Sequence, residues 1–196
     1  MLRTLSGIVV VVFLALPAAG QDIVPRFELF GGYSFLDADH GKPRIALNGW
    51  GSDFTVNLIG PLGATASFSR QYGARGSFPC YVYWVPPSGH QVFCEPPTTA
   101  RLQQVLFGPR LSLRPKGTTF FVHTLFGFSS ANSGFLWRPR SFAMGVGLGL
   151  DVPLSRRLAF RAFQIDYIPI HNGMTQWWQD ARLQMGLVVK FGGHSR

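Results

Sequence analysis

The chain has 196 residues and a formal net charge of +9; 46% of its residues are hydrophobic and only 14% are charged. Its length suits a single domain. No apolar run is long enough to cross a bilayer as a helix, and no stretch shows convincing helical periodicity, which excludes a helical membrane protein and argues against a helical soluble domain. Nucleic-acid binding is also excluded, because the positive charge comes with no basic helix or recognition motif.

The N-terminus has the layout of a secretory signal. A short basic start at Met1–Arg3 precedes an apolar run at Ile8–Leu16, Pro17 breaks that run, and small residues follow at Ala18–Gly20. This order of features is typical of a cleaved signal peptide. We therefore predict a signal peptide over residues 1–20, export through the periplasm, and a mature domain over residues 21–196. The alternative is a buried N-terminal strand or helix.

Short segments of alternating hydrophobicity fill the rest of the chain. Each is about ten residues long, the length that a tilted membrane strand requires. The clearest runs from Phe142 to Val152, where large apolar residues alternate with Gly, Ala and Asp. The predicted strands cover residues 27–36, 48–59, 62–72, 102–113, 118–128, 142–152 and 158–168, with a last strand from 183 to 191.

The connections between these strands are sorted by length. Short turns at 60–61, 114–117 and 153–157 alternate with long loops at 37–47, 73–101, 129–141 and 169–180. Up-and-down barrels have short turns on the periplasmic side and long loops outside the cell. The fold class predicted is therefore all-β: an eight-stranded antiparallel up-and-down transmembrane β-barrel with both termini in the periplasm. A soluble lipocalin-like barrel, with its apolar face inside, is the alternative.

The last strand also carries a short sequence pattern. Gln184, Gly186, Val189 and Phe191 follow the order polar, glycine, apolar, aromatic. This order resembles the C-terminal signal by which the assembly machinery of Gram-negative bacteria selects outer-membrane barrels. The resemblance implies that this machinery is a partner of the chain.

Three further segments carry a family resemblance. Residues Glu28–Phe35, Phe107–Leu113 and Gln164–Tyr167 resemble strands of the small OmpA/OmpX-type outer-membrane barrels, in particular their uncharacterised single-barrel members. The resemblance implies a bacterial outer-membrane location, a monomer, and no peptidoglycan-binding domain. It implies a structural or surface-interaction role and names no reaction.

Polar residues gather on the predicted inner face. Eight strands enclose a lumen that side chains fill, and buried charges there must be paired. The predicted lumen network consists of Glu28, Arg110, His123, Asp151, Arg161, Gln164, Asp166 and Lys190, with Asp53 and Gln184 on the same face. We interpret it as a structural plug without an open pore; a conducting or catalytic lumen is the alternative. No catalytic, cofactor or metal-binding residue is predicted, since His123 has no second ligand nearby.

Two details of this interior depend on strand register. Strict alternation in strand 158–168 would send either Arg161 or Asp166 into lipid, whereas a β-bulge between them would turn Arg161, Gln164 and Asp166 inward. The alternative is that Arg161 lies at the periplasmic rim and extends its charged end into water. At the seam between the first and last strands, Glu28 and Lys190 share the inner face. We expect them to approach within ion-pair distance.

The longest loop, 73–101, contains Cys80 and Cys94. An even pair of cysteines in an exported chain predicts a disulfide. The bonded loop, rich in aromatic residues, is a candidate adhesin-like contact site. A lipid A-modifying enzyme is a further alternative, although no nucleophile with its base stands out.

Outer-membrane lipids are the expected partners of the barrel wall. Arg70, Arg75, Arg101, Arg138 and Arg140 lie at or near the predicted outer rim, where they would meet the phosphates of lipopolysaccharide. Ordinary solvated loop charge is the alternative interpretation of these arginines.

Overall fold

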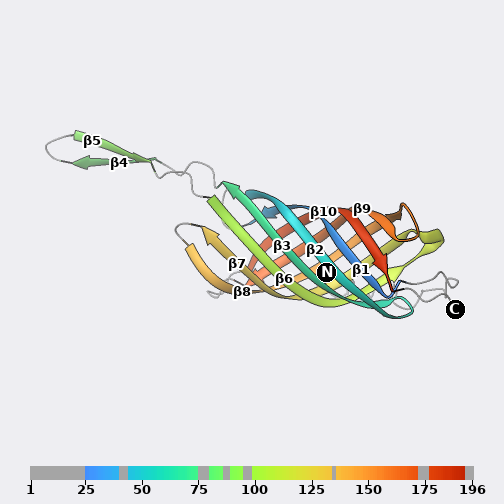
Figure 1. The fold of residues 1–196 in the computed structure, drawn as a ribbon. Helices are drawn as coiled ribbons and strands as arrows, with labels where there is room; N and C mark the ends of the chain where they lie inside the picture. The colour runs from blue at the N-terminus through green and yellow to red at the C-terminus, as the bar shows by residue number, and fades with distance from the viewer. Residues whose placement is uncertain are drawn as a thin grey trace, which may run out of the picture.

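The computed structural model describes residues 25–39, 44–74, 80–85, 89–94, 99–133, 136–171 and 177–192. Eight strands form one closed barrel in the order β1-β10-β9-β8-β7-β6-β3-β2, and every neighbouring pair is antiparallel (Figure 1). The predicted fold class is therefore confirmed. The predicted signal peptide, residues 1–20, lies outside the described residues.

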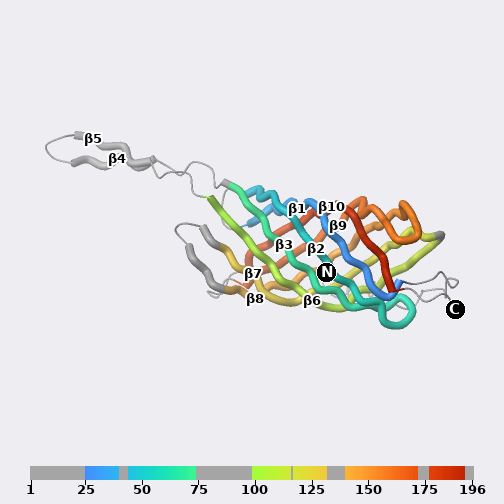
Figure 2. Tube along the Cα trace, in the orientation of Figure 1, coloured from blue at the N-terminus to red at the C-terminus, as the bar shows by residue number. Residues whose placement is uncertain are grey.

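The barrel strands agree with the predicted segments at one end and run past them at the other. Their bounds are β1 Phe27–Ala38, β2 Ile45–Ile59, β3 Leu62–Ala74, β6 Thr99–Leu113, β7 Thr119–Ser133, β8 Leu136–Pro153, β9 Leu158–His171 and β10 Trp177–Phe191. The wall closes where β1 pairs with β10, from Phe27 opposite Phe191 to Asp37 opposite Ala181. The tube in Figure 2 follows this path from blue β1 to red β10, which lie side by side.

Tight turns join the strands at one end of the barrel. Gly60 has a φ of 57°, a left-handed conformation that glycine adopts without strain, and with Pro61 it connects β2 to β3. A single 3₁₀ turn, η1 at Pro115–Gly117, connects β6 to β7. Between β8 and β9, the Ser155 hydroxyl accepts a hydrogen bond from the backbone N–H of Leu158. These are the short connections that the sequence predicts.

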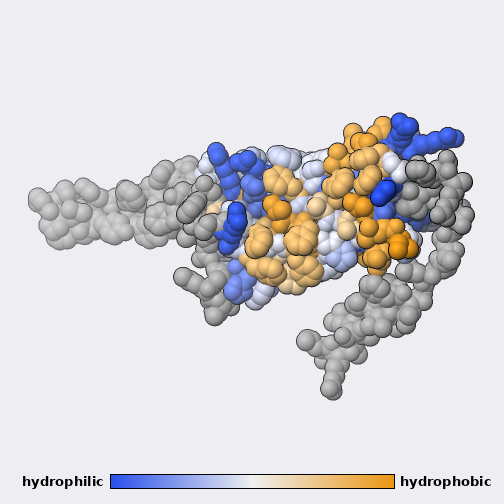
Figure 3. All heavy atoms as spheres, turned by 60° about the horizontal axis from the view of Figure 1, so that its bottom comes forward, coloured by the Kyte–Doolittle hydropathy of each residue, from blue (hydrophilic) through white to orange (hydrophobic). Residues whose placement is uncertain are grey.

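The outer wall of the barrel is apolar. Side chains such as Leu29, Phe54, Phe107, Val122 and Leu187 point away from the lumen, and Phe107 is 62% exposed. Figure 3 shows this apolar surface in orange on one side of the barrel wall. A wall of this kind is stable only against hydrocarbon, so the lipocalin-like alternative is wrong. No helix in the described part of the chain is long and apolar enough to cross a membrane, a finding that concerns helices alone.

Beyond this belt several positions of the wall exchange polarity, although polar side chains such as Gln71 and Asp180 remain buried there. At the long-loop end, Leu36, Leu47 and Leu102 are buried inside the barrel, whereas Arg101 and Gln103 point outward. This is the arrangement of a water-soluble sheet, which indicates that the strands continue past the hydrocarbon layer. The loops predicted from the sequence are therefore longer than those in the structure, because the strands extend into them.

Two apolar clusters fill the interior at this level. The first consists of Leu36, Ala38, Leu47 and Leu102, and the second of Leu106, Leu125, Ala143, Ile168 and Ile170 with Trp178 packed against it. They lie in the interior toward the end of the barrel that carries the long loops.

A β-bulge in β9 resolves the ambiguity at Arg161. Gln164 lies opposite Gln184 of β10 and Arg161 lies opposite Gly186, so Ala162 and Phe163 together face one residue. The same step appears toward β8, where Phe163 pairs with Leu150 and Arg161 with Asp151. Arg161, Gln164 and Asp166 are all buried in the interior. The bulge hypothesis is confirmed.

Deletion tests the role of this bulge. Removing Ala162 makes the register continuous toward both β8 and β10 and keeps Arg161 and Gln164 inward, so we expect a folded, heat-modifiable barrel. Removing Ile165 instead forces a polar side chain of β9 toward lipid, at a cost of about 2 kcal/mol or more. Urea titration of both variants in lipid vesicles measures the difference. Equal losses of stability in the two variants would contradict this account.

Candidate functional site

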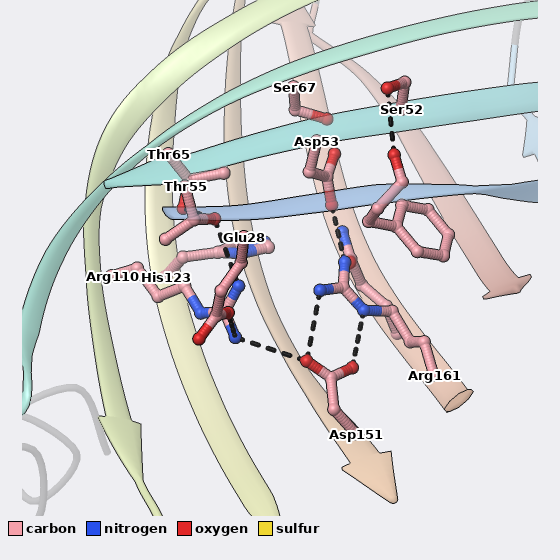
Figure 4. A network of polar contacts seen from close by, with 12 residues as sticks. Glu28, Ser52, Asp53, Thr55, Thr65, Ser67, Arg110, His123, Asp151 and Arg161 are labelled. Carbon is pink, nitrogen blue, oxygen red and sulfur yellow. Dashed lines mark hydrogen bonds and ion pairs between the residues drawn. The ribbon is translucent and has the colours of Figure 1, made fainter. Parts of the chain in front are cut away.

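The interior of the barrel holds a continuous polar network to which every barrel strand contributes. Figure 4 shows its central part, with side chains converging on the lumen. The linked residues are Glu28, Asp53, Thr55, Asn57, Ser67, Ser69, Gln104, Arg110, Arg114, His123, Asp151, Arg161, Gln164, Asp166 and Arg182.

Glu28 of β1 anchors the network at the short-turn end. Its two carboxylate oxygens lie 3.2 Å from Nη2 of Arg110 and 3.2 Å from Nη2 of Arg114. The side-chain amide of Asn57 donates a further hydrogen bond to Glu28 over 3.0 Å. Arg110 also reaches the Thr55 hydroxyl at 3.1 Å. The carboxylate of a buried glutamate is thus balanced by two arginines.

Arg161 of β9 occupies the centre. Its Nε lies 2.8 Å from Oδ1 of Asp151, and its Nη1 lies 2.6 Å from Oδ2 of Asp53 on the far wall (Figure 4). Asp151 also lies 3.4 Å from Arg110, which joins this centre to the Glu28 cluster. The guanidinium carbon of Arg161 stands 4.2 Å from the ring centre of Phe30, a cation–π contact. The arginine therefore ties β9 to β8 and β2 at once.

Asp166 organises the third part of the network. Nε2 of His123 lies 2.7 Å from its Oδ1, and Nη2 of Arg182 lies 2.8 Å from its Oδ2. Arg182 continues to the Ser69 hydroxyl at 2.9 Å. Gly147 makes room for the pair, because a Cβ there would come within 1.9 Å of Oδ1 of Asp166 and 2.6 Å of Nε2 of His123.

The structure thus joins Glu28, Arg110, His123, Asp151, Arg161, Gln164 and Asp166 in one network. The expectation for Lys190 is wrong in part: it lies opposite Glu28 in register and is half-buried, but the ion pairs of Glu28 are with Arg110 and Arg114. The arginines reach deeper into the lumen and hold the carboxylate there.

Sequence reasoning missed Arg182 and Arg114. Arg182 shares its face with Gln184, so extending the last predicted strand backward by one alternation would have found it. Arg114 follows β6 and turns back into the lumen from a segment predicted as a turn. Nothing in its local sequence distinguishes it from a solvated turn arginine.

The chemistry of the network is that of ion pairing. Its carboxylates are matched by guanidiniums at contact distance, and the His123–Asp166 pair is enclosed by Gln164 and Arg182. Across the described residues, no group of three His, Cys, Asp or Glu side chains is placed to hold a metal ion. Such an arrangement fixes the strands relative to one another and leaves the charged groups occupied.

A second candidate site lies in the insertion between β3 and β6. Two short strands, β4 at Cys80–Val85 and β5 at Gly89–Cys94, form a separate antiparallel sheet (Figure 1). The predicted loop 73–101 therefore contains regular structure. Cys80 and Cys94 are direct cross-strand partners at the base of this hairpin. Residues opposed in this way have Cα atoms about 4.5–5.5 Å apart, which suits a disulfide.

The residues of the predicted assembly signal lie on both faces of β10. Gln184 is buried in the interior, whereas Val189 and Phe191 point outward and are 41% and 43% exposed. Phe191 stacks on Phe27 of β1, with ring centres 5.5 Å apart. The terminal aromatic thus covers the seam at which the barrel closes.

Comparison with known proteins identifies the class of the fold. No family model matches the chain, and no curated protein matches it in sequence. Among solved structures it is similar to Neisserial surface protein A, with a TM-score of 0.63 and 12% identity over 84% of this chain and 97% of that one. It is similar to the outer membrane protein OprG of Pseudomonas aeruginosa, with a TM-score of 0.57 and 10% identity over 87% and 97%.

Ail, the attachment invasion locus protein of Yersinia pestis, also shares the fold, with a TM-score of 0.50 and 12% identity over 86% of this chain and 99% of that one. At these identities the likeness establishes the fold alone. The fold is that of the small eight-stranded outer-membrane β-barrels. A barrel of this class with an apolar outer wall lies in the outer membrane of Gram-negative bacteria.

Replacing Arg161 by Gln tests the energetic role of the network. The variant leaves Asp53 and Asp151 without their arginine in a buried site, so we expect a loss of about 3–5 kcal/mol in the free energy of unfolding. The matched control is Arg44→Gln, which breaks the half-exposed pair with Asp37 and should cost about 1 kcal/mol or less. Denaturant titration in vesicles gives both values. A similar small loss in both variants would show that the network does not stabilise the barrel.

Proposed function

We propose that this protein is a closed outer-membrane barrel that serves as a rigid support for a surface-interaction site, the β4–β5 hairpin. In this proposal the long-loop end faces outside the cell and the short turns face the periplasm. The observation that carries it is the filled interior, which leaves the chain's largest insertion as the part available for contact.

The filling of the lumen supports the absence of an open pore. From the short-turn end, the Glu28 cluster, Arg161 with its aspartates and the Asp166 cluster follow one another along the axis. The two apolar clusters described above lie toward the long-loop end and support a closed lumen there. Water and ions would have to displace paired charges first and packed aliphatic side chains afterwards.

The sequence of the hairpin supports a contact role. Tyr81, Tyr83 and Trp84 lie in β4, and such residues are enriched at the energetic centres of protein interfaces. A disulfide between Cys80 and Cys94 would hold the strands at their base and lower the entropy lost on binding. Two proteins of similar fold carry the words surface and attachment in their names, which agrees with this role.

Other parts of the proposal concern partners and chemistry. The proposal includes a monomeric state, and it includes assembly through the motif at Gln184, Gly186, Val189 and Phe191. A lipid A-modifying activity has less support, because the His123–Asp166 pair is buried in the lumen, away from the lipid-facing wall.

Conductance measurements test the closed lumen. Because paired side chains occupy the axis, the purified chain in planar bilayers should show no steady current steps. The variant Arg161→Gln, which removes the central cation, is measured beside it. Regular open-channel steps in the unsubstituted protein would overturn this part of the proposal.

Deletion of residues 78–96 tests the hairpin. The deletion removes β4 and β5 but no barrel strand, so the barrel should remain folded and heat-modifiable. Vesicles carrying the unsubstituted chain should bind to epithelial cells or to surfaces coated with matrix proteins, and vesicles carrying the deletion should not. Cys80→Ser with Cys94→Ser should bind more weakly than the oxidised parent. Unchanged binding after the deletion would refute the contact role.

A further inference from the structure

A basic surface lies at the short-turn end of the barrel. It consists of Arg26 before β1, Arg156 and Arg157 of the β8–β9 turn, and Lys190 of β10, and we call it the short-turn surface. The three arginines are exposed, and Lys190 is half-buried. Figure 3 shows hydrophilic side chains beyond the apolar belt at this end.

We propose that the short-turn surface binds the carboxylate groups of peptidoglycan, the cell-wall polymer that lies beneath the outer membrane. The inference rests on the orientation proposed above, in which the short turns face the periplasm. It does not depend on the contact role of the hairpin, which lies at the other end of the barrel.

Three of the basic residues follow one another across the seam of the barrel. The backbone N–H of Lys190 donates a hydrogen bond to the carbonyl oxygen of Arg157 over 2.8 Å, so the end of β10 lies beside the start of β9. On the other side, a Cβ at Gly192 would lie 3.3 Å from Cβ of Arg26. The guanidinium carbon of Arg26 lies 5.4 Å from the ring centre of Phe27, a cation–π contact. These residues therefore mark the ends of β9, β10 and β1 in turn.

The charge of this end is unbalanced. Among the described residues within five positions of a short turn or of either end of the barrel chain, only Glu28 and Asp151 are acidic. Both carboxylates are buried and are held by Arg110, Arg114 and Arg161. The ion pairs formed within the described residues leave out all four cations of the short-turn surface. This end therefore presents positive charge to an anionic partner.

The partner approaches from the periplasm. Lys190 alternates with Val189 and Phe191, which point outward and are 41% and 43% exposed, so Lys190 lies on the inner face, away from lipid headgroups. Arg156 and Arg157 belong to a turn that ends the barrel. A ligand that meets these residues together must come along the barrel axis.

The short-turn surface lies level with the membrane surface. Leu58 and Leu154 are 60% and 61% exposed, and they continue the apolar belt to the ends of β2 and β8. A partner that is spread out parallel to the membrane can therefore cover this surface.

The chemistry favours a polymer with repeated carboxylates. An exposed ion pair is weak on its own, because water and salt screen it. A polymer that carries a carboxylate on each repeat can engage several cations at once and gains affinity through its effective concentration. Peptidoglycan has this chemistry, since its short peptides carry free carboxylates and its strands form a layer beneath the outer membrane.

Binding to isolated cell-wall sacculi tests the proposal. The full chain, purified in a non-ionic detergent that leaves both ends accessible, is sedimented with sacculi freed of attached protein, and the bound fraction is measured. We expect saturable binding that added salt weakens and that is lost when the sacculus carboxylates have been converted to amides. The double variant Arg156→Gln with Arg157→Gln should bind at least about fivefold more weakly.

A charge-matched control comes from the opposite end. Arg70→Gln with Arg101→Gln removes two arginines from the outer wall of β3 and β6 and should leave sacculus binding unchanged. Equal weakening in the two double variants, or equal binding of amidated and untreated sacculi, would overturn the proposal. So would a loss of phosphatidylglycerol binding by Arg156→Gln with Arg157→Gln, measured by native mass spectrometry, while sacculus binding is retained, because the surface would then be a lipid site.

Two further measurements separate this result from the proposed function. The deletion of residues 78–96 should keep full sacculus binding, since it removes no residue of the short-turn surface. In whole cells, the variant Ser155→Cys should react with a membrane-impermeant thiol reagent only after the outer membrane has been permeabilised. Reaction in intact cells would place the short turns outside and would overturn the inference.

Discussion

Closure of the wall is the constraint on which the rest of the structure depends. In hydrocarbon an unpaired strand edge leaves backbone N–H and C=O groups without partners, and each costs several kcal/mol, so β1 must pair with β10 over the whole membrane section. Closing eight strands fixes a narrow lumen that side chains must fill. The alternation that places apolar residues in lipid sends the polar ones inward, where their charges have to match. Ion pairing in the lumen is thus a consequence of closure.

That matching depends on residues far apart in sequence. Arg161 meets Asp53 across the lumen, and Arg182 meets Ser69, although more than 100 positions separate each pair. The register of the strands decides whether such partners face one another. The bulge at Ala162 and Phe163 shifts the register of β9 by one residue, which keeps both Arg161 and Asp166 on the inner face. An irregularity in one strand is therefore what allows a regular network across all of them.

The sequence predicted the membrane section of this barrel well, because there burial in lipid and burial in the lumen impose opposite polarities on alternate residues. It predicted the outer ends poorly for the same reason. Past the belt, Leu36 and Leu102 turn inward while Arg101 turns outward. A prediction that places apolar residues on the outside therefore assigns these strand ends to loops. The hairpin of β4 and β5, with Cys80 and Cys94, was predicted as a loop because no membrane imposes opposite polarities on its alternate residues. Arg114 was missed because its partners lie on other strands.

The reversal of polarity at Leu36, Leu47 and Leu102 also separates two parts of the interior. Within the membrane the interior is committed to balancing charge, and each arginine there already holds carboxylates. Toward the long-loop end the interior holds two apolar clusters beside buried polar side chains such as Gln71 and Asp180. Arg70 and Arg101 lie on the outer wall of β3 and β6, above the apolar belt. A rigid, filled barrel can vary its function through its rim and its insertions because nothing in its interior has to change.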